Sequence, residues 1–549
     1  MSDIASLIHP YLSHGRSGLL PALQAVQAEY GWISQEQAAE IARLLHVPLA
    51  EVHGVIEFYD LLHNKPRKKR TLHVCTDAAC SLRGADQRLR DLSADPTLAV
   101  KTDPGEELQV EPSPCLGLCD HAPAMVLENG WEWRILGSNG EWMDRPLSLV
   151  GGTVRRITVR CGNGRTSLSA YGGYRAWNRA QQLSPQQVID EVKASGLFGR
   201  GGAAFPTGLK WESAARAEGW PKYVVCNADE SEPGTFKDRL LLADDPHLVL
   251  EGMRIAAYAV GASKGYIYLR GEYAYLRPIL EQALREAQEA GLLDGFEVEI
   301  RMGAGAYICG EETALFESIE GKRGFPRIKP PFPTTHGLFN KPTVINNVET
   351  LANVPFIIEH GAAAYRELGS EKSPGSKLFC LSGDVAQPGI YEAPFGITLK
   401  ELLEMAGGMA EGGSPQAILL GGAAGAFATP RHLDIRLTYE DLRQASLTLG
   451  SGVVMVFDQR RDLRQVLLKI GRFFAHESCG KCYPCQMGTR RQAEILERLA
   501  SGRLLPGDRE RLEDVGWTMS DASLCGLGQT AAMAVLSAIK EWPELFTPS

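Results

Sequence analysis

The chain has 549 residues, 44% of them apolar, and a formal charge of -9. This length allows several domains with separate cores, and the mixed charges without a basic stripe argue against nucleic acid as the main partner. Near the N-terminus no basic segment leads into an apolar core, and no run of about 18 apolar residues occurs. We therefore expect a cytoplasmic protein without direct membrane insertion.

The chain begins with short amphipathic helices and continues into a small α/β domain. Apolar residues recur at helical spacing up to Ser34, which is a predicted N-cap. From Thr71 on, short β-type runs alternate with helix-compatible sequence. We assign residues 1–135 to this helical lead and α/β domain, and residues 136–175 to a linker.

A second α/β region, a small β-rich unit and a helical part follow in that order. A helix is predicted from Pro185 to Gly196, with Ser184 as its N-cap, and glycine-rich loops alternate with apolar strands after it. The predicted fold class is therefore α/β multidomain. The predicted units are an α/β domain, a β-rich domain and a mostly helical domain, at residues 176–370, 371–437 and 438–549.

Twelve cysteines are too few and too clustered for a secreted disulfide scaffold. Eight of them form two sets, and thiolates suit iron–sulfur clusters or zinc. The first set has spacers longer than those of most structural zinc sites, which favours iron–sulfur, with zinc as the alternative. Its members are Cys75, Cys80, Cys115 and Cys119.

The second set is a stronger signal. Three cysteines at CxxCxxC spacing can hold three corners of a cubane, and a distant fourth closes it. These are Cys479, Cys482, Cys485 and Cys525. The remaining cysteines are expected to be small buried side chains. They are Cys161, Cys226, Cys309 and Cys380.

A glycine-rich loop precedes the first strand of the second α/β region. Gly199, Gly201 and Ala204 formally match GxGxxA, but a helix rather than a strand comes before them, so a Rossmann assignment is weak. Glycines let backbone N–H groups approach a phosphate or flavin, and Arg200 and Lys210 add positive charge. Tight packing turns are the alternative interpretation.

Polar side chains then gather at the ends of predicted elements. One group follows an apolar strand, where open α/β sheets bind ligands, and a solvated acidic turn is the alternative. Glu311 and Glu312 stand where a turn enters a helix, so they could simply complement the helix dipole. The other candidate residues are Asn227, Asp229, Glu230, Ser231, Glu232, Lys329, Phe332, Asn346 and Asn347.

In order and spacing these blocks resemble a known family. Residues 195–549 resemble the flavin subunit of respiratory complex I and its relatives in soluble NAD-linked formate dehydrogenases and NAD-reducing hydrogenases. Residues 1–135 resemble the companion thioredoxin-like [2Fe-2S] subunit, and residues 377–425 a soluble-ligand-binding β-grasp domain. The resemblance implies FMN, NAD(H), one [2Fe-2S] cluster and one [4Fe-4S] cluster in the helical domain.

The resemblance also implies site residues. NAD(H) would be held by Phe205, Glu232, Lys329 and Phe332, and Glu312 would orient the nicotinamide as the catalytic residue. Ser213 and Ala204 depart from the family, which often has an aromatic residue and glycine there. The FMN site would comprise Gly199, Arg200, Gly201, Gly202, Lys210, Asn227, Asp229, Glu230, Ser231, Tyr307, Gly310, Glu311, Glu312, Asn346, Asn347 and Thr350.

The implied activity is that of an NADH dehydrogenase, or diaphorase. It transfers hydride between NAD(H) and FMN and passes single electrons through the clusters to or from a partner subunit. We predict the molybdenum or tungsten alpha subunit of a soluble NAD-dependent formate dehydrogenase as that partner. A nickel–iron hydrogenase or a complex I-type enzyme is the alternative. A non-catalytic electron-transfer or scaffold subunit and a zinc-stapled structural protein are the alternatives from other classes.

Overall fold

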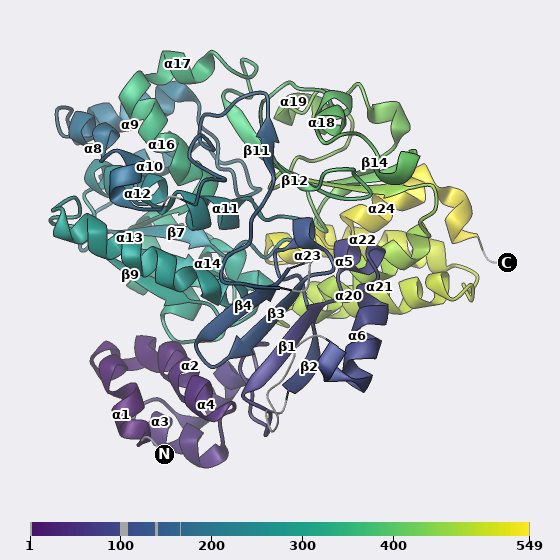
Figure 1. The fold of residues 1–549 in the computed structure, drawn as a ribbon, viewed down its shortest axis with the longest axis horizontal. Coiled ribbons are helices and arrows are strands. Elements are labelled where there is room, and N and C mark those ends of the chain that lie inside the picture. Colours follow the sequence, from purple (N-terminus) through teal and green to yellow (C-terminus); the bar gives the residue numbers. More distant parts are fainter. Residues whose placement is uncertain (1–2, 99–107, 138–140, 165, 548–549) are drawn as a thin grey trace.

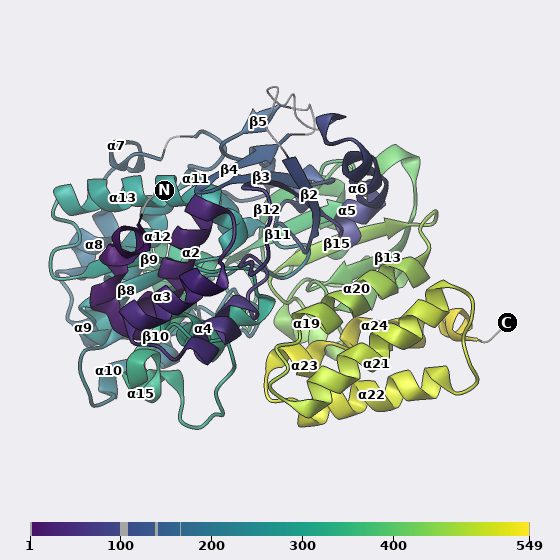
Figure 2. The ribbon, with the colours of Figure 1, turned by 90° about the horizontal axis from the view of Figure 1, so that it is seen from below.

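The computed structural model describes residues 3–98, 108–137, 141–164 and 166–547. The N-terminal helices pack beside the second α/β domain, and the C-terminal helices lie at the other side of the molecule (Figures 1 and 2). The first small sheet lies between them. Among the described residues, every helix is too short or too polar to cross a membrane.

The helical lead confirms the predicted cap at Ser34. The Gln37 N–H donates to the Ser34 hydroxyl over 3.2 Å, and the Ser34 N–H donates to the Gln37 side chain over 2.8 Å. This capping box satisfies two free donors at the helix start. The elements of the lead are α1 (Ile4–Ile8), the 3-10 segment η1 (His9–Gly18), α2 (Leu19–Tyr30), α3 (Gln35–Leu45) and α4 (Leu49–Ile56).

The predicted β-type runs of the first α/β domain form a five-stranded sheet of order β2-β1-β3-β4-β5. Strands β1 and β2 are parallel, with Cys75 opposite Ser113, so Cys75 and the loop that holds Cys115 reach the same edge of the sheet. Its elements are β1 (Arg70–Cys75), α5 (Ala78–Leu82), α6 (Ala85–Ala94), β2 (Leu108–Ser113), β3 (Met125–Asn129), β4 (Glu132–Leu136) and β5 (Trp142–Met143).

The second α/β domain, called the parallel-sheet domain below, has the strand order β10-β7-β8-β9 with every pairing parallel. Asn227 and Asn347 are register partners at the carboxyl ends of β7 and β10, the edge at which such sheets bind ligands. Its strands are β7 (Tyr223–Ala228), β8 (Lys264–Leu269), β9 (Glu297–Met302) and β10 (Thr343–Asn347).

Helices cover this sheet and confirm the predicted helix after Ser184. Ser184 caps α9 and Gly196 ends it with a φ of 68°. The helices are α7 (Leu168–Tyr171), α8 (Arg175–Ala180), α9 (Pro185–Ser195), α10 (Thr207–Arg216), α11 (Lys237–Asp244), α12 (Pro246–Val260), α13 (Arg277–Glu289), α14 (Glu312–Ile319), α15 (Pro333–His336), α16 (Val348–His360) and α17 (Ala362–Arg366).

The β-rich unit is a six-stranded sheet of order β14-β13-β15-β11-β12-β6. Strand β15 lies beyond residue 437, in sequence expected to be helical, and β6 comes from the expected linker. The six residues of β15 are all buried, and strands on both sides supply their hydrogen bonds. Tertiary pairing therefore decides that this segment is a strand. The elements are β6 (Val150–Gly152), β11 (Ser376–Gly383), β12 (Gly389–Pro394), α18 (Leu399–Met405), β13 (Pro415–Leu420), β14 (Ala426–Ala428), α19 (Tyr439–Gln444) and β15 (Val453–Asp458).

The C-terminal part is helical, as expected. Helix α20 packs on α21, and α21 on α22. The loops before α21 and α23 carry cysteines at their N-cap positions, Cys482 and Cys525. The helices are α20 (Leu463–Glu477), α21 (Tyr483–Ala500), α22 (Asp508–Ala522), α23 (Gly526–Thr530) and α24 (Met533–Glu541).

Candidate active site and cluster sites

The four C-terminal cysteines line one cavity, although Cys525 is far from the others in sequence. Helix ends bring them together, since Cys479 follows α20, Cys485 lies in the first turn of α21 and Cys525 precedes α23. Ile308 and Pro326 of the parallel-sheet domain line the same cavity. Four soft thiolate donors around one closed space fit a [4Fe-4S] cluster.

The first four cysteines also converge, and none of their side chains is more than 4% exposed. The Sγ atoms of Cys115 and Cys119 are 3.7 Å apart, and the thiols of Cys115 and Cys80 raise the pKa of Cys75. The Ala124 N–H donates to the Cys80 sulfur over 3.4 Å. This buried four-thiol site fits a [2Fe-2S] cluster. The four isolated cysteines are buried, as predicted.

The glycine-rich loop is a closed turn between two helices. The Gly199 N–H donates to the Phe205 carbonyl over 2.9 Å, and the Arg200 N–H donates to the Thr350 hydroxyl over 2.8 Å. A Cβ on Gly201 would lie 3.1 Å from the Cβ of Asn347, so glycine permits this close approach. Helix α9 precedes the loop, which excludes the Rossmann arrangement at this position.

The expected positive charge of Arg200 does not reach this loop's surface. Its guanidinium is fully buried and donates to the Tyr365 hydroxyl over 2.7 Å and to the Pro374 carbonyl over 3.3 Å. It also lies 4.6 Å from the centroid of the Phe395 ring. None of these partners belongs to the predicted site. Arg200 therefore offers the site its backbone, while its charge joins the parallel-sheet domain to the β-rich unit.

The loop after β7 places Asp229 against the segment that holds Gly310. The Asn227 amide donates to the Gly310 carbonyl over 2.9 Å, and the Ser231 hydroxyl donates to Asp229 Oδ1 over 3.0 Å. The buried Oδ2 of Asp229 has no hydrogen-bond partner among the described residues. Burial raises the pKa of Asp229 to about 8, although the charge of Arg270 opposes the shift. A buried oxygen without a partner beside a glycine fits a site that a polar ligand completes.

The carboxylate of Glu230 does not line this site. It accepts hydrogen bonds from the Asp238 and Arg239 N–H groups, over 2.8 and 3.0 Å, at the start of α11. It also accepts from the Tyr273 hydroxyl over 3.0 Å. Burial raises the pKa of Glu230 to about 7. Its side chain therefore holds the helix start, and the role of Glu230 in lining the flavin cradle stays a prediction.

Glu232 faces the β-rich unit. It accepts from the Tyr307 hydroxyl over 2.5 Å and from the Ala424 N–H over 2.9 Å. Burial raises the pKa of Glu232 to about 7. Neither partner lies in the segment of Lys329 and Phe332, with which Glu232 was expected to act.

Two lysines bracket Glu312 at the start of α14. Lys329 Nζ donates to Glu312 over 2.7 Å and to Glu311 over 2.9 Å, and Lys210 Nζ lies 3.3 Å from the other oxygen of Glu312. Burial alone would raise the pKa of Glu312, but Lys210 and Lys329 lower it below its ordinary value. Glu311 also accepts from the Thr313 and Ala314 N–H groups and caps α14, as the dipole interpretation expects. Glu311 thus caps the helix, whereas the partners of Glu312 are the two lysines.

Two aromatic rings beside these charges are open to solvent. Phe205 is 52% exposed and Phe332 is 57% exposed. The Lys210 ammonium lies 5.9 Å from the centroid of the Phe205 ring. Ser213 donates to the Thr334 hydroxyl over 2.9 Å, so a polar pair stands where relatives often have an aromatic residue. Exposed rings next to cations suit a nucleotide base and its phosphates.

The amides at the end of β10 are oriented by the fold. Asn346 Oδ1 accepts from the buried Trp211 indole over 2.9 Å. Asn347 caps α16, and its amide donates to Asp238 over 2.5 Å. Asn347 lies beside the glycine loop, and the orientation of both amides depends on residues far away in sequence.

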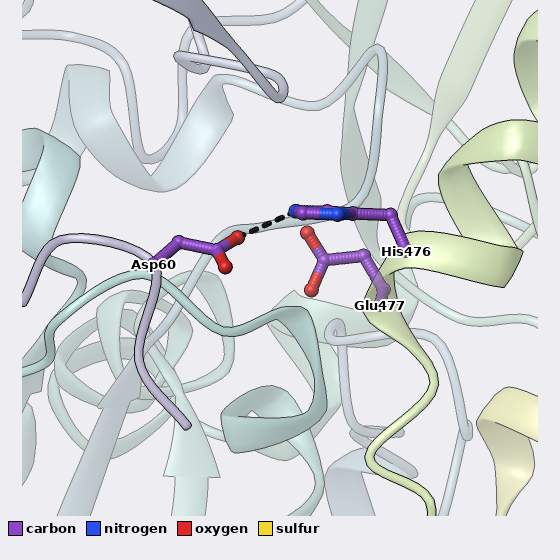
Figure 3. A group of neighbouring side chains, drawn as sticks. All are labelled: Asp60, His476 and Glu477. Atoms are coloured by element: carbon purple, nitrogen blue, oxygen red, sulfur yellow. Dashed lines mark hydrogen bonds and ion pairs between the residues drawn. The ribbon is translucent and has the colours of Figure 1, made fainter. Parts of the chain in front are cut away.

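Sequence reasoning missed two residues at the end of α20. Glu477 accepts from the Tyr307 N–H over 2.9 Å, and His476 binds Asp60 of the helical lead over 2.7 Å. Figure 3 shows the three side chains pointing toward one another. One ligand atom of each lies within 4.8 Å of the others, a spacing that could hold a cation. The hydrogen bond to Asp60 raises the pKa of His476 to about 9. The two side chains therefore form an ion pair between the helical lead and α20. No local pattern signals these contacts.

Four family profiles match the chain. They are described as a thioredoxin-like [2Fe-2S] ferredoxin (residues 4–133), a Nuo51 FMN-binding domain (residues 192–356), an SLBB domain (residues 378–423) and an NADH-ubiquinone oxidoreductase-F iron-sulfur binding region (residues 465–548). These matches and the structure confirm the predicted fold class and the predicted cofactors.

Individual proteins are similar to this chain over most of its length. The chain is 46% identical over 399 residues to a subunit of NADH-quinone oxidoreductase from Rhizobium meliloti (strain 1021), covering 71% of this chain and 95% of that one. It is 36% identical over 580 residues to the NAD-reducing hydrogenase HoxS subunit alpha of Cupriavidus necator, covering 99% and 94%. A crystal structure of an NAD+-reducing [NiFe]-hydrogenase in the H2-reduced state matches with a TM-score of 0.85 at 35% identity, covering 97% and 92%.

Proposed function

Because this chain belongs to the family of NADH-binding FMN subunits of complex I, here joined to a thioredoxin-like [2Fe-2S] domain, we propose that it is the diaphorase subunit of a larger redox complex. Its activity is that of an NADH dehydrogenase with FMN and iron–sulfur clusters. The proposal adds which residues carry that activity and which partner receives the electrons.

One observation carries the proposed electron route. The segment Tyr307–Gly310 borders the predicted flavin site through Asn227, and its second residue, Ile308, lines the cavity of the four C-terminal cysteines. The flavin site and the proposed [4Fe-4S] site therefore share one short wall. This proximity supports direct passage of electrons between them.

The residues of the chain would act mainly by positioning. When bound, FMN supplies the chemistry that accepts a hydride from NADH and releases its electrons one at a time. The backbone of Gly199, Gly201 and Gly202 would let it approach the loop closely. Phe205 and Phe332 would stack on the nucleotide. Glu312, kept ionised by Lys210 and Lys329, would orient the nicotinamide.

The same proposal assigns the cysteines. The first set would hold the [2Fe-2S] cluster and the second set the [4Fe-4S] cluster. Convergence of each set around one buried or enclosed space supports the assignment. A zinc-stapled structural protein would have no need of the flavin loops.

For the partner, we retain the molybdenum or tungsten subunit of an NAD-dependent formate dehydrogenase as the first candidate, from the sequence resemblance. A nickel–iron hydrogenase is the second candidate, and the likeness to the hydrogenase alpha subunit over 99% of this chain favours it. Purification of the native complex, followed by metal analysis for molybdenum, tungsten and nickel, separates the two. A complex holding nickel alone would reject the formate dehydrogenase proposal.

The site assignments are tested with purified protein reconstituted with FMN, iron and sulfide. Cys479→Ser should remove the [4Fe-4S] signal in electron paramagnetic resonance while sparing FMN, the [2Fe-2S] signal and NADH-driven reduction of a dye that takes electrons from flavin. Cys226→Ser is the matched control, because Cys226 is a buried cysteine outside both sets. If wild-type protein bound no FMN, or if both cysteine variants behaved alike, the proposal would fail.

A further inference from the structure

A buried arginine connects two of the predicted redox sites, the first cysteine set and the flavin site. Arg270 directly follows β8 in the parallel-sheet domain and is 2% exposed. One terminal nitrogen donates to the carbonyl of Cys115 over 2.6 Å, and the other donates to the carbonyl of Glu230. One side chain therefore joins a cysteine loop of the first α/β domain to the acidic loop of the predicted flavin site.

The neighbouring Tyr273 strengthens this junction. Its hydroxyl donates to Glu230 over 3.0 Å and lies 3.5 Å from the Gly117 carbonyl. A Cβ on Gly117 would come within 2.1 Å of that hydroxyl, so the cysteine loop lies directly on this ring. Arg270 itself lies 5.0 Å from the Tyr273 ring centroid. The contact is close-packed, and this packing holds the arginine in place.

Among the described residues, the close counter-ion of Arg270 is Glu272. Glu272 accepts from its guanidinium over 2.7 and 3.1 Å, and Glu272 is 7% exposed. The terminal nitrogen that donates to the Cys115 carbonyl also donates to Glu272. The positive group thus stands between the cysteine loop and the carboxylate. In a poorly solvated interior, water screens these charges little, so they interact with other charges several ångströms away.

We propose that Arg270 is a positioning residue that raises the reduction potential of the [2Fe-2S] cluster, with Glu272 as the opposing charge. The inference rests on the proposed function, in which Cys75, Cys80, Cys115 and Cys119 hold that cluster. Reduction adds one electron and one negative charge to the cluster, and a fixed cation hydrogen-bonded to a ligand's backbone stabilises the reduced form. Arg270 donates directly to the Cys115 carbonyl, whereas Glu272 is bonded to the arginine, so we expect the arginine charge to dominate.

The test is a redox titration of the full chain carrying FMN and both clusters, with the [2Fe-2S] signal followed by electron paramagnetic resonance. Arg270→Gln should shift the reduction equilibrium at least about tenfold toward the oxidised cluster, a fall of about 59 mV for a one-electron couple. Glu272→Gln should shift it in the opposite direction. The double variant should fall between the single variants. Arg270→Lys keeps the charge and should remain near the wild type.

Controls separate electrostatics from damage. Arg254→Gln removes a half-buried arginine, which packs on Trp177 and donates to the Asp294 carbonyl, away from both cysteine sets, and should leave the potential unchanged. If Arg270→Gln does not fold, the raised potential expected for Glu272→Gln and the wild-type potential expected for Arg270→Lys still decide the question. Unchanged potentials, or shifts of the same sign in Arg270→Gln and Glu272→Gln, would overturn the inference. Absence of a [2Fe-2S] signal in wild-type protein would instead overturn the proposed function.

Discussion

A buried charge network under the predicted flavin site offers a sharp test. Glu349 in α16 is fully buried, and its carboxylate lies 3.1 Å from the Lys237 ammonium and 3.5 Å from that of Lys377. It also accepts from the Leu378 N–H over 3.0 Å. The carboxylate of Asp238 lies 2.7 Å from the Lys237 ammonium and balances its charge. Two cations and two anions therefore join the parallel-sheet domain to β11 of the β-rich unit.

Glu349→Gln would leave one cation of this network without a counter-charge. Removal of one partner from a buried pair costs about 3–5 kcal/mol. At 1.36 kcal/mol per decade, that cost corresponds to a loss of between about 10² and 10⁴ in protection from hydrogen exchange. Glu349→Gln combined with Lys377→Met removes one charge of each sign, so much of the protection should return. Asn347 accepts from Lys237 over 3.3 Å, so we also expect weaker FMN retention in the single variant.

The pH dependence has a definite sign. Burial lowers the pKa of Lys377 to about 8, despite its attraction to Glu349. The unfolded chain keeps this proton up to the ordinary lysine pKa of about 10.4, so it binds more protons than the folded chain above pH 8. Stability from this group therefore rises with pH over that interval. In Glu349→Gln the attraction is gone and the rise should begin at lower pH.

Hydrogen exchange followed by mass spectrometry on peptides that contain β11 and α16 measures these effects locally. This choice matters because a multidomain chain with several cofactors has no single free energy of unfolding. Peptides from α24, remote from the network in sequence, serve as the internal control. Wild-type protection of β11 and α16 in Glu349→Gln would refute the reasoning, as would a double variant less protected than the single one.

Three further predictions concern separate sites. Glu312→Gln should raise the KM for NADH about tenfold, or 1.4 kcal/mol, at unchanged FMN content, and a change in FMN content alone would contradict the assigned role. Ala204 has a φ of 51°, in the left-handed region. In hydrogen exchange, Ala204→Gly should therefore stabilise its loop by up to about 1 kcal/mol, whereas Ala203→Gly should destabilise it. Equal effects of the two substitutions would contradict this prediction. The raised pKa of His476 means that its ion pair with Asp60 stabilises the fold fully below pH 6.5 and loses this effect as the pH rises through about 9. Because these side chains are 54% and 38% exposed, the contribution is about 1 kcal/mol or less, and thermal melts of Asp60→Asn across this range should lose the pH-dependent difference.

Much of the fold was predictable because its signals are local. The caps at Ser34 and Ser184, the glycine that ends α9 and the β-type runs before the cysteines each involve residues within a few positions of one another. Strand β15 was not predictable in this way. Its apolar run also suits a buried helix segment, and only its neighbours β11 and β13 make it a strand.

The amino-acid sequence by itself determined the chemistry available to this protein: two sets of thiols, a glycine loop, and carboxylates and amides at the ends of elements. The tertiary structure alone decided which of those groups come together and which are bonded elsewhere. Arg200 and Glu230 lie in predicted motifs, yet their charged groups are hydrogen-bonded to Tyr365 and to the start of α11, respectively. Arg270 lies outside every predicted motif, yet it touches the loop of Cys115 and the loop of Glu230. The reason is physical, since a buried charge must find a partner wherever the fold brings one, and that partner is seldom near in sequence.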